Sequence, residues 1–142
     1  VSVPAGTEYP IRNDNPVVIG SSSVGSALTV AILQKMIAVR DTRPVYVVHV
    51  DADEASFAHR SRILELLEAY QGYSWLETYY VDDPEEAVPL LQGREWDSGA
   101  EVYLCGSPRF MRRVRRVAVV KGIVPERIHY EVFAPDSWFG FD

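Results

Sequence analysis

Short apolar runs alternate along this chain with segments whose apolar residues recur every three or four positions. The apolar runs, which predict strands, are residues 16–20, 45–50, 75–81, 102–104 and 128–133. The periodic segments, which predict helices, are residues 27–39, 57–70, 85–91 and 107–121. Because the runs are continuous and rich in Val, Ile and Tyr, they are typical of parallel strands that are buried on both faces. The pattern therefore predicts an α/β fold, a doubly wound parallel sheet between two layers of helices.

The organisation expected is a single folded domain preceded by a connecting segment. Residues 1–15 are rich in Pro, Gly, Asn and charged residues, which is typical of a linker or domain junction. Residues 16–142 form the predicted domain, and 142 residues in total are enough to bury a core. The sequence begins with Val1 rather than Met. We therefore expect a processed form or an excised piece of a longer protein.

The composition of the chain limits the kinds of molecule that it is expected to bind and the cellular compartment in which it is expected to occur. The 14 Lys and Arg residues are outnumbered by 20 Asp and Glu residues, giving a net charge of −6, which argues against nucleic acid as the main partner. A single cysteine excludes an intrachain disulfide and favours a reducing, cytoplasmic location. No run approaches the roughly 18 apolar residues of a membrane span, so none is expected.

A turn of small residues follows the first predicted strand and opens the first helix. In this position backbone amides and the helix dipole favour a phosphate group. The spacing is not a true G-x-G-x-x-G, because serines stand where glycines would. The alternative is a tight strand-to-helix turn without a ligand. The candidate cofactor-binding residues are Ser22, Ser23, Val24, Gly25, Ser26 and Ala27.

A second motif, YLCGSP, runs from the fourth predicted strand into the last helix. Cys105 and Gly106 end the strand, and Ser107 and Pro108 open the helix. A glycine at this point lets the backbone turn sharply or approach a flat ligand closely. Gly106, Ser107 and Pro108 are therefore candidate cofactor-binding residues, and Cys105 is a candidate catalytic residue. The alternative for Cys105 is a buried structural cysteine.

Glu131 lies in the otherwise apolar last strand, where a carboxylate is rare unless it is paired or faces a cleft. The carboxyl ends of parallel strands meet at one edge, so Glu131 and Cys105 are expected side by side at the mouth of a cleft. The alternative for Glu131 is an edge position facing solvent. His129, His49 and His59 form no metal-ligand spacing with the cysteine, and they are interpreted as structural.

Asp82 follows the third predicted strand and is a candidate ribose-binding residue. Acidic residues at such strand ends can meet the adenosine ribose hydroxyls of a dinucleotide and repel a 2′-phosphate. The alternative is a solvated turn before Pro84.

Five arginines crowd the last predicted helix, while an apolar stripe predicts its buried face. The arginines are Arg109, Arg112, Arg113, Arg115 and Arg116, and the stripe is Phe110, Val114, Val117 and Ala118. The basic face is either simply solvated or docks an acidic partner or another domain.

The motifs YLCGSP and IHYEVFAP together resemble the NAD(P)-binding domain of the ferredoxin–NADP reductase family, with the closest likeness to the C-terminal reductase domain of flavohaemoglobins. They are similar to that family's Y-L-C-G-P-P and I-H-Y-E-x-F-G-P segments, and the resemblance spans residues 16–135. It implies a Rossmann-like, five-stranded parallel sheet of order 3-2-1-4-5. NADH or NADPH would lie across its carboxyl edge.

The resemblance also implies a reaction, the transfer of hydride from NAD(P)H to FAD, with electrons passing on to haem or another acceptor. Cys105 and Glu131 would flank the nicotinamide, and Phe133 would lie near the ring site. Asp82 would favour NADH over NADPH. FAD is expected only in a full-length protein, where a flavin-binding domain, with or without a globin domain, lies in cis. An electron-acceptor protein is a further expected partner.

The sequence departs from the family at the first turn, where G-[VI]-G-x-T-P is replaced by S-V-G-S-A-L at residues 23–28. Ala27 lacks a hydroxyl for the cofactor, and Leu28 replaces a proline that would rigidify the helix start. One lost hydrogen bond to a charged group costs about 1.5–3 kcal/mol, which Ser26 is expected to offset in part. The alternative function is a degenerate Rossmann-like interaction module, which no longer binds nucleotide and docks a partner through its arginine-rich helix.

Overall fold

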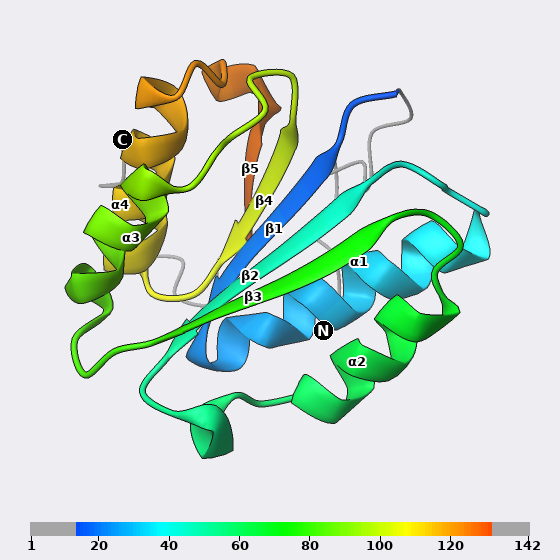
Figure 1. Ribbon diagram of the computed structural model, residues 1–142, viewed down its shortest axis with the longest axis horizontal. Helices are drawn as coiled ribbons and strands as arrows, with labels where there is room; N and C mark the ends of the chain where they lie inside the picture. The colour runs from blue at the N-terminus through cyan, green and yellow to red at the C-terminus, as the bar shows by residue number, and fades with distance from the viewer. Residues whose placement is uncertain (1–13, 132–142) are drawn as a thin grey trace.

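The computed structural model describes residues 14–131, which form a sheet of five parallel strands in the order β3-β2-β1-β4-β5 (Figure 1). The strands are β1 (Val17–Ser22), β2 (Val45–Asp51), β3 (Ser74–Tyr80), β4 (Glu101–Cys105) and β5 (Ile128–Glu131). All five correspond to the predicted apolar runs. The described residues confirm the predicted fold class and strand order.

Two pairs of helices cover opposite faces of the sheet (Figure 1). One face carries α1 (Ser26–Ala38) and α2 (Arg60–Ala69), and the other carries α3 (Ala87–Gly93) and α4 (Pro108–Val120). Short 3₁₀ turns are η1 (Ser23–Gly25), η2 (Glu54–Ser56), η3 (Pro84–Glu86) and η4 (Pro125–Arg127). Within residues 14–131, no helix has the length and apolar character needed to cross a membrane.

Alternating side chains of the central strands supply a separate core to each face. In β1, Val17 and Ile19 pack with Leu28 and Ile32 of α1, whereas Val18 belongs to the cluster on the opposite side. This opposition follows from the two-residue period of a strand. Because helices cover both faces, the whole of β1 is buried, which explains why its first residues appear in the sequence as an unbroken apolar run.

Helix α4 has the boundaries and the buried face that the sequence predicts. The hydroxyl oxygen of Ser107 accepts a hydrogen bond from the Phe110 N–H at 3.1 Å, and Pro108 occupies the first turn. Proline is suited to this position because the first N–H groups of a helix have no partner inside it. The four predicted stripe residues are all buried: Phe110, Val114, Val117 and Ala118.

The first strand is longer than predicted, because the ladder with β2 continues through two serines. Ser21 pairs with His49 and Ser22 with Val50, both in parallel register. The apolar run stops at residue 20 in the sequence, so the apolar pattern did not indicate that the strand continues through these two serines. Ser22, expected in the turn, is instead the last residue of β1 and is buried.

The second helix starts three residues later than predicted, at Arg60. The residue before it, His59, has a left-handed backbone with φ 63°, which interrupts any continuation of the helix toward Phe57. The apolar spacing of residues 57–70 predicts that Phe57 and Leu64 face inward. Phe57 is buried, but it packs from the preceding loop onto the ring of His49. Leu64 is 38% exposed, so that part of the helical phase was wrong.

The main chain is closely packed where η1 meets the end of β4, and this contact generates a stability prediction. A Cβ atom on Gly25 would lie 2.3 Å from the carbonyl oxygen of Cys105, whereas a Cβ on Gly93 would meet nothing within 4 Å. We expect Gly25→Ala to lower the free energy of unfolding by about 1–3 kcal/mol. Gly93→Ala should leave it unchanged or raise it by up to about 1 kcal/mol, because Gly93 ends a helix.

Urea denaturation followed by circular dichroism measures both variants. Equal stability of the two proteins would contradict the close packing between η1 and β4.

Candidate functional site

The candidate site lies at the carboxyl edge of the sheet, where β1 and β4 are neighbours. The chain leaves β1 toward α1 on one face and leaves β4 toward α4 on the other (Figure 1). This reversal is the topological switch point of an open α/β sheet, and ligands bind in the crevice outside it. The residues that follow the two strands, Ser23–Gly25 and Gly106–Ser107, flank this point.

The two loops of the switch point are in direct contact, and glycine is required on both sides. Gly106 has φ 153°, and a Cβ at this position would lie 2.3 Å from the Oγ of Ser22. Gly25 abuts the main chain of Cys105 from the other side. The predicted residues of the first turn and those of the YLCGSP motif are therefore brought together at this point.

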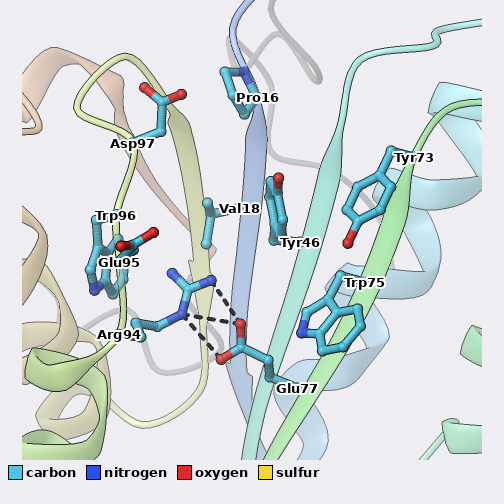
Figure 2. A pocket seen from close by; sticks show the side chains of 10 residues that line it. All are labelled: Pro16, Val18, Tyr46, Tyr73, Trp75, Glu77, Arg94, Glu95, Trp96 and Asp97. Carbon is cyan, nitrogen blue, oxygen red and sulfur yellow. Dashed lines mark hydrogen bonds and ion pairs between the residues drawn. The ribbon is translucent and has the colours of Figure 1, made fainter.

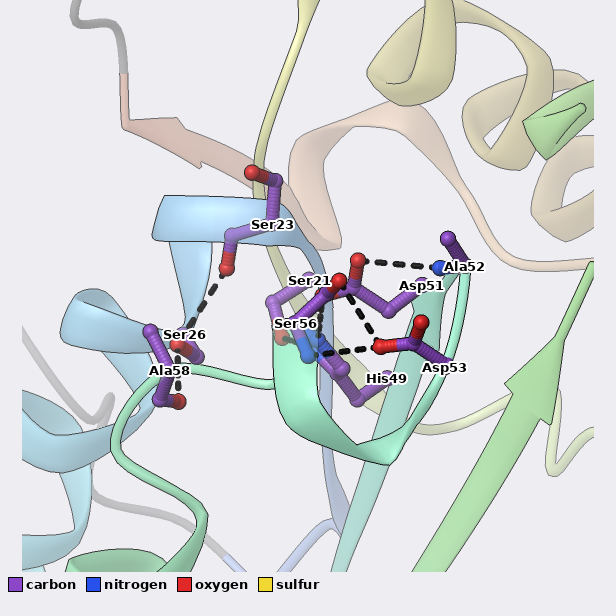
Figure 3. Close-up of polar contacts among 9 residues, drawn as sticks. All are labelled: Ser21, Ser23, Ser26, His49, Asp51, Ala52, Asp53, Ser56 and Ala58. Atoms are coloured by element: carbon purple, nitrogen blue, oxygen red, sulfur yellow. Dashed lines mark hydrogen bonds and ion pairs between the residues drawn. The ribbon is translucent and has the colours of Figure 1, made fainter. Parts of the chain in front are cut away.

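Within the first turn, Ser23 and Val24 are the exposed residues; Val24 is 64% exposed. Ser23 has a left-handed backbone with φ 49°, a conformation more easily adopted by glycine. Ala27 is only partly buried, at the start of α1. The turn thus presents its backbone, the side chain of Ser23 and one apolar side chain, that of Val24, at the edge (Figure 3).

Ser26 is the exception in this turn, because its side chain is used inside the protein (Figure 3). The residue is buried, and its hydroxyl donates to the carbonyl oxygen of Ala58 at 2.6 Å, with the carbonyl oxygen of Ser23 at 3.3 Å. A hydroxyl has one hydrogen to donate, and here it links α1 to the loop before α2. While that bond is made, the side chain of Ser26 does not donate to a phosphate.

Cys105 and Glu131 are partners in the register of β4 and β5. Neighbouring strands lie about 4.8 Å apart, so the two residues occur side by side at the carboxyl edge, as predicted. Cys105 is completely buried among the residues that pack under α1. Phe133, the remaining candidate from the same motif, lies outside the described residues.

Asp82 is exposed beyond the end of β3, at the same edge of the sheet. Two strand spacings, or about 10 Å, separate β3 from β1, so Asp82 is distant from the first turn. Its neighbour Asp83 is engaged locally, accepting the Glu85 N–H at 3.0 Å. Asp82 is therefore the better placed of the two for a ligand that extends along the edge.

A chain of polar side chains that the sequence did not predict links β1 to β2 beneath the site (Figure 3). Ser21 Oγ lies 2.7 Å from His49 Nδ1, and His49 Nε2 lies 2.8 Å from Asp51 Oδ2. The ring of Phe57 stacks on the imidazole with centroids 3.7 Å apart. Asp51 also accepts the Ala52 N–H, so the chain of bonds fixes the turn that follows β2.

Burial disfavours the charged form of the His49 imidazole. It lowers the pKa of His49 below its usual value of 6.5, although the hydrogen bond to Asp51 and the negative charge of Asp51 both act to raise it. A neutral imidazole has one donor and one acceptor nitrogen. Nε2–H therefore donates to Asp51, and Nδ1 accepts from the hydroxyl of Ser21. Ser21 and His49 are both fully buried, which is consistent with a structural role.

The sequence contained two signals for this arrangement. His49 and Asp51 are separated by two positions in a strand and so share one face. His49 also pairs with Ser21 in register, but that pairing becomes visible only once β1 is known to continue past residue 20. Of the two other histidines, His129 bonds to Glu101 at 3.0 Å, and His59 precedes α2. Within residues 14–131, no group of three His, Cys, Asp or Glu residues could hold a metal ion.

The lowered pKa of His49 generates a prediction about pH. Because His49 binds a proton more readily in the unfolded chain, its contribution to stability is complete above pH 6.5 and is lost as the pH falls below that value. We expect its imidazole resonance to titrate below 6.5 in an NMR experiment. Asp51→Asn should lower the midpoint further, since it removes the charge that favours protonation. A midpoint above 6.5 in the unsubstituted protein would contradict this assignment.

No family model matches the chain, but individual proteins do. A flavohemoprotein of Rhizobium meliloti (strain 1021) is 29% identical over 154 residues, covering 96% of this chain and 37% of the relative. One from Vibrio cholerae is 28% identical over 143 residues, covering 94% of this chain and 34% of the relative. The chain spans about a third of the length of these relatives.

Solved structures share the fold. The flavohem-like FAD/NAD-binding domain of nitric oxide dioxygenase from V. cholerae superposes with a TM-score of 0.70 and 23% identity, covering 92% of this chain and 56% of that one. Flavohemoglobin from Malassezia yamatoensis gives 0.71 and 21%, with 85% and 32% covered. Ferredoxin-NADP+ reductase from Plasmodium falciparum gives 0.67 and 14%, with 84% and 52% covered. The homologues of this chain are thus flavohemoglobins, and its fold is that of the reductase domains of the flavohemoglobin and ferredoxin–NADP reductase families.

Proposed function

We propose that this chain is the pyridine-nucleotide-binding part of a flavin-dependent oxidoreductase, which passes hydride from NAD(P)H to FAD. The observation that carries the proposal is the contact between the first turn and the Cys105–Gly106 segment at the topological switch point. Those segments come from opposite halves of the sheet and meet where an α/β sheet binds its ligand. The similarity to flavohemoproteins over 94–96% of the chain supports the same conclusion.

The roles of the residues follow from their positions. The backbone of Ser22–Ser26, at the start of a 13-residue helix, would hold the pyrophosphate. Gly106 and Ser107, with Pro108 behind them, would admit the flat nicotinamide ring, with Cys105 and Glu131 beside it. The cofactors supply the redox chemistry when they are bound. The chain binds and orients the nicotinamide, and Phe133 would complete its ring site.

In this proposal the first turn binds the pyrophosphate of the nucleotide weakly. Ala27 offers no hydroxyl, and the hydroxyl of Ser26 is bonded to Ala58. The backbone amides and the helix dipole would then provide the main attraction for the pyrophosphate. They contribute less binding free energy than a full set of side-chain hydrogen bonds would. Affinity for the nucleotide would therefore depend on contacts spread along the carboxyl edge.

The other partners are proposals that follow from the relatives. FAD would be held by a flavin-binding domain in the same polypeptide, with or without a globin domain. Electrons would continue to haem or to an acceptor protein. We also propose a cytoplasmic location, where thiols such as that of Cys105 stay reduced.

The alternative is an interaction module that has lost nucleotide binding and docks through α4. The structure gives α4 less free charge than the sequence implied. Arg109 and Arg113 both contact Glu85, at 3.0 and 2.8 Å, while Arg116 is exposed. An ion pair at the surface leaves less charge available to a partner.

Calorimetric titration of the 142-residue chain with NADH and ADP-ribose separates the two functions. We expect saturable binding of NADH with a dissociation constant of about 0.1–1 mM, or about −4 to −5.5 kcal/mol, because Ala27 offers no hydroxyl and the hydroxyl of Ser26 is bonded to Ala58. ADP-ribose should bind with similar affinity, since it contains the same pyrophosphate that the first turn is proposed to bind. Absence of heat from both ligands at millimolar concentration would favour the interaction module.

Preference for NADH is tested at Asp82. Asp82→Asn should tighten NADPH binding about three- to tenfold, because a partly screened repulsion of the 2′-phosphate is removed. NADH affinity should change little. Glu95→Gln, which neutralises an exposed carboxylate outside the carboxyl edge, is the matched control and should affect neither nucleotide. Equal effects of the two substitutions would remove Asp82 from the site.

A further inference from the structure

A second concave region lies at the other end of the sheet, toward the amino ends of β1, β2 and β3 (Figure 2). It is an open groove of about 570 Å³ between those strands and the residues 94–97 that follow α3. Tyr46, Tyr73 and Trp75 line the strand side, and Trp96 lies across from them. The carboxyl-edge candidates discussed above are not among its lining residues.

Large aromatic surfaces of the groove are in contact with solvent. Tyr73 is 57% exposed and Trp75 is 50% exposed, and the Tyr73 ring lies 5.8 Å from that of Tyr46. Trp96 lines the opposite side of the groove, so aromatic rings border it on both sides. Exposed aromatic surface next to polar residues is characteristic of an interaction site.

The charged residues of the groove are mainly acidic. Among the lining residues of the described part of the chain, Glu77, Glu95 and Asp97 supply three carboxylates and Arg94 supplies the one cation. Glu77 is satisfied by Arg94 and by the hydroxyl of Tyr79. Glu95 and Asp97 are exposed on the side opposite the strands, and one oxygen of Asp97 accepts the Gly99 N–H. The groove therefore presents negative charge next to aromatic faces.

The groove already contains one guanidinium, which shows the chemistry that it accommodates. Arg94 bonds to both oxygens of Glu77 at 2.8–3.2 Å, and its Cζ lies 5.0 Å from the ring centroid of Trp96. A planar cation placed between a carboxylate and an aromatic face is stabilised by both. Trp75 and Tyr73 on the strand side offer aromatic faces to a second guanidinium, and Glu95 and Asp97 on the opposite side offer carboxylates.

We propose that this groove binds a basic peptide segment of a partner protein, with an arginine side chain inserted between the aromatic strand side and the carboxylates of Glu95 and Asp97. Charge complementarity favours such a partner over a second copy of this chain, whose own net charge is −6. The groove is separate from the candidate nucleotide site. Its occupation therefore does not depend on the proposed oxidoreductase function.

The test uses the 142-residue chain and a fluorescein-labelled peptide, Gly-Arg-Ala-Arg-Gly, observed by fluorescence anisotropy. We expect saturable binding that weakens as salt is raised, because the groove carboxylates contribute charge. A peptide with citrulline in place of both arginines has the same shape without the charge, and it should bind at least about fivefold more weakly. Equal affinity of the two peptides would overturn the proposal.

Substitutions locate the binding. Trp75→Ala should weaken binding of the arginine peptide about fivefold or more, since it removes an exposed ring of the strand side. Tyr80→Ala, which removes another exposed ring of the same strand outside the groove, should not. Glu95→Gln combined with Asp97→Asn should also weaken binding about fivefold, whereas Asp82→Asn at the other edge should not.

Several outcomes would overturn the proposal and are distinct from failure of the nucleotide experiment. Binding that survives both groove variants would place the peptide elsewhere on this acidic protein. Sedimentation showing a dimer that Trp75→Ala dissociates would identify a second copy as the occupant. The NADH titration is measured on the same variants, and Trp75→Ala should leave its result unchanged.

Discussion

The close approach of the β1 and β4 loops is the constraint on which the rest of this molecule depends. Gly25 abuts the carbonyl of Cys105, so a side chain there would require movement of the main chain. Gly106 abuts the hydroxyl of Ser22 and has φ 153°, a backbone conformation that other residues rarely adopt. This contact brings the starts of α1 and α4 to the same point of the sheet. It also explains why two segments about eighty residues apart in the sequence form one candidate site.

Polar side chains beneath that contact are used to hold the edge in place. Ser21, His49 and Asp51 join β1 to β2, and Ser26 joins α1 to the loop before α2. Each of these groups is largely buried and would be costly to leave without a partner. The same residues therefore stabilise the site while reducing the number of hydroxyls that can reach a ligand. In the proposed nucleotide site, few side-chain hydroxyls would therefore be available to a phosphate.

Most of the architecture could be predicted from local patterns. Continuous apolar strands alternating with periodic segments required a parallel sheet with helices on both faces, and the stripe of α4 from Phe110 to Ala118 was correct in detail. The errors arose at element boundaries that are formed by polar residues. Ser21 and Ser22 continue β1 because β2 supplies their ladder partners. His59 delays α2 because its left-handed backbone interrupts a helix that its neighbours would otherwise favour.

The sequence by itself determined the fold class, the placement of YLCGSP and IHYE at the ends of adjacent strands, and the unusual composition of the first turn. These follow from side-chain periodicity and from the shared edge of parallel strands. Only the tertiary structure decided which polar groups remain available, since the bonds of Ser26 and His49 join residues about thirty positions apart. It also revealed the aromatic groove, because Tyr46, Trp75 and Trp96 are brought together by strand pairing and by a loop, not by any spacing along the chain.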